Sequence, residues 1–181
     1  MNNNQKPLIN IILSSVFLSL GIVLPFLTGN VAFLGNSFLP MHLPVLLCGF
    51  ICGWKYGGIV GLITPLLRAL LVGMPPLFPV AFIMSFELAT YGVVAGLLYR
   101  LLSKKIINVY ISLIVSMIIG RVVWGLVSMI VSASLGIEFT FSIFLSSAII
   151  TAIPGIIFQL IFIPALIILM QKNDVLSGYL K

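Results

Sequence analysis

The sequence predicts an all-α membrane protein: one compact bundle of six transmembrane helices, forming a single domain over residues 1–181, with both termini in the cytoplasm. Of its residues, 61% are hydrophobic and only 7% are charged, whereas a soluble domain carries about 25% charged residues. The mean hydropathy is +1.31. So few charges cannot cover a soluble surface, and most of the apolar runs approach the about 20 residues that cross a bilayer.

Turn residues divide the apolar sequence into six predicted helices. In chain order these are 8–27, 41–53, 57–72, 79–102, 109–133 and 141–170. The first apolar run exceeds the roughly 7–15 residues of a signal-peptide core, so we expect this helix to be retained. The second and third are shorter than the about 20 residues of a straight span, so they are expected to tilt or to lie partly in the interface. Pro154 and Pro164 are expected to bend the sixth helix.

The basic residues predict the topology. One side of the six-helix arrangement carries Lys6, Lys55, Arg100, Lys104, Lys105, Lys172 and Lys181. The opposite loops, near 28–40, 73–78 and 134–140, hold no Lys or Arg. Because cytoplasmic loops of membrane proteins are enriched in Lys and Arg, this asymmetry places both termini in the cytoplasm. The net charge of +6 is then a topology signal rather than a sign of nucleic-acid binding.

The sequence lacks the residues that several function classes require. The sequence contains no GxxxxGK[ST] loop for nucleotide phosphates, so energy for transport must come from an ion gradient or a partner. His42 is the only histidine, which excludes a multi-histidine metal site, and we expect no cofactor. Cys48 and Cys52 lack the CxxC spacing of redox or zinc sites and are expected to pack as small hydrophobic residues. The absence of a nucleophile–base arrangement disfavours an enzyme.

Arg68, Glu87 and Arg121 each lie inside an apolar stretch. A charge at membrane depth costs at least about 2.5–3.5 kcal/mol, so such residues usually face a bundle interior and mark a substrate or ion path. With a rise of about 1.5 Å per residue, all three fall near the midplane or in the outer half and could converge. One interpretation is an ion pair that only locks the helices together. The favoured interpretation is an outward-open pocket for an acidic ligand, in which one arginine binds the ligand and the other pairs with Glu87.

Other polar and aromatic residues are candidates for the same pocket. Asn36 and His42 lie where the first loop enters the second helix, although a lone histidine there is more often structural. Tyr91 is one turn from Glu87, and Trp124 is one turn from Arg121. Aromatic residues beside each charge suit a flat ligand, although interior packing explains them as well. Gln159 is a further deep polar residue, for which an interhelical hydrogen bond is an equal explanation.

Small residues recur at helical spacing in two places. Glycines four residues apart, which let helix backbones approach closely, occur at Gly49, Gly53, Gly57 and Gly61 and again at Gly92 and Gly96. Their spacing leaves open whether the partner helix is internal or belongs to another protein. Ser15 and Ser19, four apart in the first helix, form a stripe that faces either a docking partner or the bundle interior.

These features together resemble an S component, the substrate-binding membrane subunit of an energy-coupling factor (ECF) vitamin transporter. The resemblance rests on six helices in fewer than 200 residues, on SLGIVLPF at 19–26, and on the segment 39–100 with its glycine spacing, PLLR and MPP. It implies an ABC importer of the bacterial plasma membrane, in which this subunit captures a vitamin and docks on a membrane-embedded coupling subunit that two cytoplasmic ATPases drive. A small-residue AxxxA-type motif would meet the coupling subunit, and here Ser15 and Ser19 replace its alanines. The 28–40 loop would cover the ligand, with Asn36, Met41 and His42 at its base.

The ligand itself remains open among several vitamins. Two arginines and one glutamate favour an acid such as pantothenate, nicotinate or a folate, with pantothenate the leading candidate, while neutral riboflavin or pyridoxine stays possible. The alternative function is a small ion-coupled secondary transporter with Glu87 as its proton carrier. A structural or assembly subunit is a further possibility.

Overall fold

The structure is a computed structural model that describes residues 5–28, 39–103, 105–136 and 152–172. All regular secondary structure in these residues is helical. The α-helices are α1 (Gln5–Val23), α3 (His42–Cys52), α4 (Trp54–Val72), α5 (Phe82–Leu101), α6 (Ile106–Ser134) and α8 (Ile153–Lys172). The 3₁₀ helix η1 (Leu24–Thr28) continues α1, and the π-helical turn η2 (Leu77–Ala81) precedes α5.

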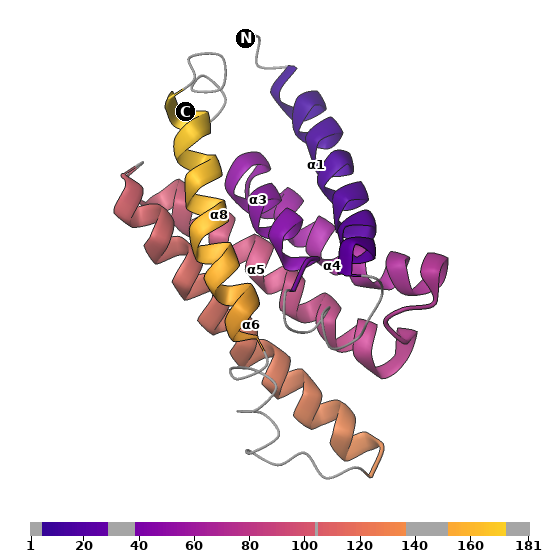
Figure 1. Cartoon of the computed structure of the whole chain (residues 1–181). Coiled ribbons are helices and arrows are strands. Elements are labelled where there is room, and N and C mark those ends of the chain that lie inside the picture. The colour runs from indigo at the N-terminus through magenta and orange to yellow at the C-terminus, as the bar shows by residue number, and fades with distance from the viewer. Residues whose placement is uncertain (1–4, 29–38, 104, 137–151, 173–181) are drawn as a thin grey trace.

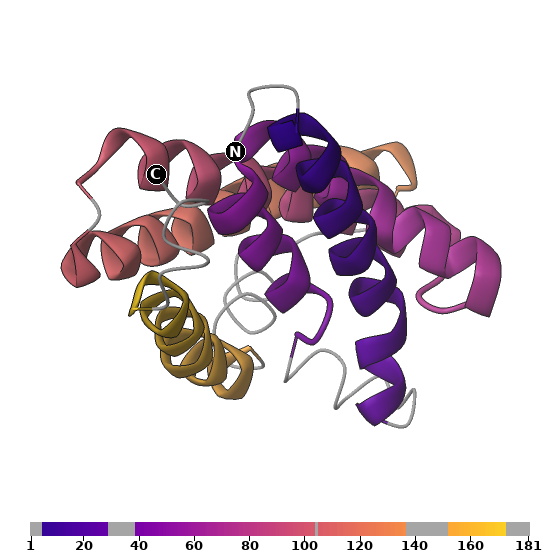
Figure 2. The same cartoon turned by 90° about the horizontal axis from the view of Figure 1, so that it is seen from above.

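The described helices confirm the expected membrane bundle. Five spans are long and apolar enough to cross a membrane, and α3 is a shorter apolar helix. Both views place α3 between α1 and α8 (Figures 1 and 2). The N-terminal end of α1 and the C-terminal end of α8 lie at the same end of the bundle (Figure 1), as an even number of crossings requires. Of the basic residues that predict the topology, Lys104 and Lys181 lie outside the described residues.

The boundary between the second and third helices differs from the prediction. Gly53 alone separates α3 from α4, with φ +96° and its N–H donating to the Gly49 carbonyl at 3.1 Å. Glycine tolerates this positive φ without steric cost, so a single residue turns the chain. Trp54, predicted as part of the turn, is therefore the first residue of α4. That helix has 19 residues and is long enough to span, so the expectation that it falls short was wrong.

Boundaries of the fourth and fifth helices also differ from the prediction. The fourth helix was predicted to start at Pro79, but the chain forms η2 there, with Phe78 in an extended conformation, and α5 begins at Phe82. The fifth helix extends further than expected at both ends, and its 29 residues measure about 43 Å. In the sixth helix, Pro154 lies in the first turn of α8 and Pro164 lies in its interior, while residues 141–151 of the predicted helix lie outside the described residues.

Glycines bring three helix backbones into direct contact. A Cβ atom added to Gly49 would lie 2.6 Å from the Gly92 carbonyl oxygen, and one added to Gly57 would lie 2.7 Å from the Gly49 Cα. A Cβ on Gly96 would lie 2.7 Å from the Gly49 carbonyl oxygen. No real side chain fits at these distances, so α3, α4 and α5 pack this closely only because glycine has no Cβ. The glycine pattern therefore serves internal packing.

Candidate functional site

Glu87 is the centre of a buried polar cluster formed by α3, α5 and α6. Its Oε1 lies 2.9 Å from Arg121 Nη1 and accepts a hydrogen bond from the Tyr91 hydroxyl at 3.0 Å. His42 Nε2 lies 3.5 Å from the same oxygen. The Glu87 and His42 side chains are each 2% exposed, and the Arg121 side chain is 15% exposed. One carboxylate oxygen thus joins three helices inside the bundle.

Local sequence explains how these side chains meet. Glu87 and Tyr91 are four residues apart on α5, where side chains share one helix face. His42 is the first residue of α3, and its ring lies 5.2 Å from the Tyr91 ring, measured between centroids. Gly120 makes room for Tyr91, because a Cβ at that position would collide with carbon atoms of the tyrosine ring. Gly120 therefore lets α6 approach α5 and carries Arg121 to Glu87.

The Arg121 guanidinium has a second edge that the cluster does not use. Nη1 faces Glu87, but the buried Nε and Nη2 atoms have no hydrogen-bond partner among the described residues. These two nitrogens are the side-on edge of the guanidinium, whose parallel N–H groups match the two oxygens of a carboxylate. Both ring nitrogens of His42 also lack a hydrogen-bond partner there. The cluster is therefore charge-paired at one side and rich in unused donors at the other.

Arg68 lies elsewhere, against the end of α1. Its Nη1 donates to the Ile22 carbonyl at 2.6 Å, and its guanidinium lies 5.0 Å from the centre of the Phe26 ring. Pro25 has no N–H for the Ile22 carbonyl in the 3₁₀ turn, and Arg68 supplies a donor at that place. Among the ion pairs of the described residues, none joins Arg68 to Glu87. The three membrane-depth charges do not converge: the structure brings Arg121, and not Arg68, to Glu87.

The packing of α4 on α5 explains this separation. Gly57 lies against Gly92 and Gly61 against Leu88, so the two helices run antiparallel in a defined register. Continuing this register places Arg68 level with Ala81, about 9 Å along the helix axis from Glu87. Trp124 is half-buried on α6, one turn from Arg121. Asn36 lies outside the described residues.

Two additional buried polar atoms lack a partner in the described part of the chain. They are Ser128 Oγ on α6 and Gln159 Nε2 on α8, in residues that are 3% and 1% exposed. The sequence identified Gln159 as a deep polar residue, but the interhelical bond considered for it is absent at Nε2 among these residues. Ser128 was not singled out, because a serine in an apolar helix usually bonds its own backbone. Its spacing of seven residues from Arg121, which places both on one face, was the available signal.

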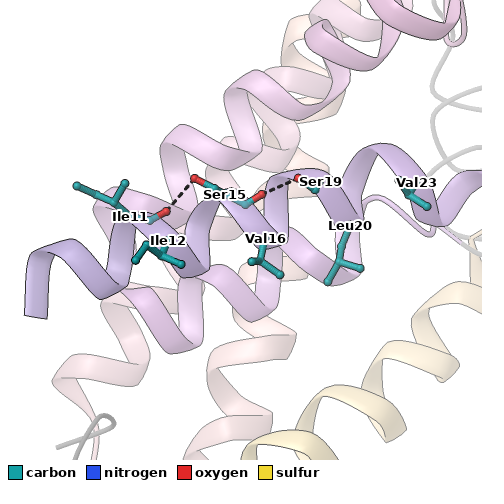
Figure 3. A pocket seen from close by; sticks show the side chains of 7 residues that line it. All are labelled: Ile11, Ile12, Ser15, Val16, Ser19, Leu20 and Val23. Atoms are coloured by element: carbon teal, nitrogen blue, oxygen red, sulfur yellow. Dashed lines mark hydrogen bonds between the residues drawn. The ribbon is translucent and has the colours of Figure 1, made fainter.

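The outer face of α1 carries the serine pair. Ser15 and Ser19 are exposed, and each hydroxyl donates to a carbonyl of its own helix, Ser15 to Ile11 at 3.0 Å and Ser19 to Ser15 at 2.9 Å. They line a shallow apolar groove of about 510 Å³ together with side chains of the same helix (Figure 3). The other members of this α1 groove are Ile11, Ile12, Val16, Leu20 and Val23.

The opposite face of α1 packs into the bundle. Ser14 is buried and accepts a hydrogen bond from the Cys48 thiol at 3.6 Å, and a Cβ on Gly21 would lie 2.6 Å from Thr64 Cγ2. The small residues of α1 thus divide between two faces. Ser14 and Gly21 face α3 and α4, whereas Ser15 and Ser19 face outward.

Comparison with known proteins identifies the family. The family model "ECF transporter, substrate-specific component" matches residues 10–169. The chain belongs to this family. No curated protein and no solved structure gives a significant match. As an ECF substrate-specific component, or S component, the protein is a multi-pass membrane subunit of a transporter, and family membership implies a small-molecule substrate, a coupling subunit and ATPases.

Proposed function

We propose that this S component captures a water-soluble vitamin or precursor carrying a carboxylate, with pantothenate the leading candidate, and that the carboxylate binds at the free edge of Arg121. The observation that carries the proposal is the pair of buried guanidinium nitrogens, Nε and Nη2, without a partner among the described residues. A buried donor without a partner costs about 1–3 kcal/mol, and more when the group is charged. A ligand carboxylate removes that cost and forms two charge-assisted hydrogen bonds.

Glu87 prepares Arg121 for this role. Its carboxylate offsets the charge of the guanidinium in the empty site and holds Nη1, so that the other edge is oriented before the ligand arrives. Because the guanidinium is already oriented, binding carries a smaller entropic cost for ordering this side chain. Tyr91 donates a hydrogen bond to Oε1 of Glu87, and the His42 ring lies 3.5 Å from the same oxygen, so both residues surround the carboxylate that orients Arg121. In this proposal Arg68 acts at the α1–α4 contact rather than on the ligand.

The outer face of α1 is proposed as the docking surface for the coupling subunit. The α1 groove is apolar and lined by small Ser15 and Ser19, whose hydroxyls are satisfied within α1, so another helix can approach without leaving polar groups unpaired. The coupling subunit and two cytoplasmic ATPases would supply the energy, and the assembly would reside in the bacterial plasma membrane.

A binding experiment tests the proposal directly. The purified protein is analysed by native mass spectrometry for a co-purified small molecule and is then titrated with pantothenate, nicotinate, folate, riboflavin and pyridoxine. A carboxylate-bearing vitamin is expected to bind, and Arg121→Ala is expected to weaken that binding by more than about tenfold. Absence of binding to all five vitamins contradicts the proposal.

The ion-coupled alternative makes a different prediction. It needs Glu87 to gain and lose a proton, yet the guanidinium at 2.9 Å stabilises the charged carboxylate. Uptake that persists when the partner ATPases are inactivated, and that stops when the proton gradient is removed, would support that alternative. Uptake that stops with the ATPases supports the S-component mechanism.

A further inference from the structure

Gln159 carries a fully buried amide whose nitrogen makes no hydrogen bond in the described part of the chain. Its residue is 1% exposed, and Nε2 has no hydrogen-bond partner among the described residues. Gln171, on the same helix, provides the contrast, because its Nε2 donates to the Tyr99 hydroxyl at 2.9 Å. A buried amide nitrogen without a partner is costly, so its presence indicates a group outside the described residues that pairs with it.

One contact relates the position of Gln159 on α8 to that of Glu87 on α5. Gln171 of α8 meets Tyr99 of α5, and the two helices cross obliquely (Figure 1). Gln159 precedes Gln171 by twelve residues, and Glu87 precedes Tyr99 by the same number. Each is therefore about 18 Å along its helix from the Gln171–Tyr99 contact. The amide and the carboxylate are thus equally far along their helices from that contact.

The face of α8 that carries Gln159 points into the bundle. Gln159, Ile163 and Ile167 follow one another at four-residue spacing and share one helix face. Ile163 and Ile167 belong to the same buried core as Leu43 and Tyr91. Leu43 follows His42 in the chain, and Tyr91 is the hydrogen-bond partner of Glu87. Gln159 extends this inward face by one turn, toward the end of the bundle where the cluster lies.

The buried polar atoms without a partner on Arg121, Gln159 and Ser128 can all donate hydrogen bonds. Arg121 Nε and Nη2 are donors only, Gln159 Nε2 is a donor, and the Ser128 hydroxyl can donate. Ser128 lies two turns beyond Arg121 on the same face of α6, so the two side chains line one path along that helix. A matching ligand must present acceptors at more than one place, and a purely hydrocarbon remainder would leave the amide unpaired.

We propose that Gln159 is a specificity-determining residue that binds a neutral oxygen acceptor, such as an amide carbonyl or a hydroxyl oxygen, on the same substrate whose carboxylate binds Arg121. The substrate class is thus an organic acid with a second oxygen acceptor remote from its carboxylate. This inference rests on the proposed function, because it requires the carboxylate at Arg121. Ser128 provides an additional donor two turns beyond Arg121 on the same face of α6.

The ligand order tests the substrate class. Calorimetric titration of the wild-type protein compares pantothenate and folate, which carry remote amide oxygens, with nicotinate, whose ring carries no second oxygen. Either of the first two is expected to bind more tightly than nicotinate. Tighter binding of nicotinate, or of neutral riboflavin or pyridoxine, overturns the proposed class. Failure of all five to bind overturns the proposed function and this inference together.

The role of Gln159 is tested with a matched pair of variants, Gln159→Met and Gln171→Met. Gln159→Met removes an unpaired buried amide, so the ligand-free protein should keep or gain thermal stability, while its affinity for the tighter of pantothenate and folate falls by about tenfold or more. Gln171→Met removes a hydrogen bond that is made, so it should lower stability and leave affinity within about twofold. Unchanged affinity in Gln159→Met, with Arg121→Ala still weakening binding, overturns the role of Gln159 and leaves the proposed function intact.

A structural role for Gln159 predicts the opposite pattern. If the amide holds helices together, Gln159→Met lowers the stability of the ligand-free protein as Gln171→Met does, and that result overturns the inference. Gln159→Glu gives a second measurement, because the side chain keeps its shape, loses its donors and gains a charge that repels a carboxylate-bearing ligand. It is expected to weaken binding further than Gln159→Met.

Discussion

Arg121 Nη1 lies 2.9 Å from Glu87 Oε1, while Nε and Nη2 of the same guanidinium are buried without a partner among the described residues. The arginine is thus held by one edge and available at the other. A buried charge in a membrane protein can pair with another charge or recognise a ligand. In Arg121 these two roles fall on different edges of one guanidinium, because one edge pairs with Glu87 and the other is available to a ligand.

The Glu87–Arg121 pair should show strong energetic coupling. Removal of one partner from a buried ion pair costs about 3–5 kcal/mol, because the other charge is left uncompensated. Glu87→Gln and Arg121→Met should each lower thermal stability, and their effects should be non-additive by about 0.5–3 kcal/mol in a double-mutant cycle. The matched control is the cycle of Glu87→Gln with Arg68→Met, whose effects should add. Coupling of Glu87 to Arg68 and not to Arg121 contradicts the structure.

Arg68 should act on the stability of α1. Arg68→Met removes the donor to the Ile22 carbonyl and the contact with Phe26, so we expect a loss of about 1–3 kcal/mol. Phe26→Leu should be non-additive with it, since both changes affect the same contact. Hydrogen exchange should show faster opening of the last turn of α1, with little change in α6. Normal protection of that turn in Arg68→Met excludes the role.

Gly120 should be required for the position of Tyr91. Gly120→Ala places a methyl group against the tyrosine ring, and overpacking of this kind costs about 1–3 kcal/mol. Binding of the carboxylate vitamin should weaken with it, because α6 can no longer bring Arg121 to Glu87. Tyr91→Leu in the Gly120→Ala background should recover stability by relieving the collision, although it removes the hydrogen bond to Glu87. An equally stable Gly120→Ala protein argues against this contact.

The two faces of α1 should respond differently to a larger side chain. Ser15→Leu and Ser19→Leu enlarge the outer face, so ligand binding and stability of the purified subunit should be retained while uptake by the complete transporter is lost. Ser14→Leu is the matched control on the inner face, where the added volume collides with α3 and lowers stability. Normal uptake in both outer variants rejects the α1 groove as the docking surface.

Local sequence predicted those parts of the site that depend on one helix. The spacing of Glu87 and Tyr91 placed them on one face of α5, and their hydrogen bond follows from it. Depth along an axis, however, does not determine which neighbouring helix a side chain meets. Arg68 and Arg121 were equal candidates for Glu87, and the glycine contacts between α4 and α5 decide between them by setting the register that carries Arg68 toward α1.

Composition by itself determined that this protein is a membrane bundle, because 7% charged residues cannot form a soluble surface and long apolar runs must be buried in lipid or in protein. The basic residues determined the predicted orientation, because cytoplasmic loops of membrane proteins are enriched in Lys and Arg. Only the tertiary structure decided that Gly120 makes room for Tyr91, that Ser14 is buried while Ser15 is exposed, and that one edge of Arg121 is left unpaired among the described residues. These outcomes depend on how helices are rotated and packed against each other, and that rotation is set by contacts between residues far apart in the chain.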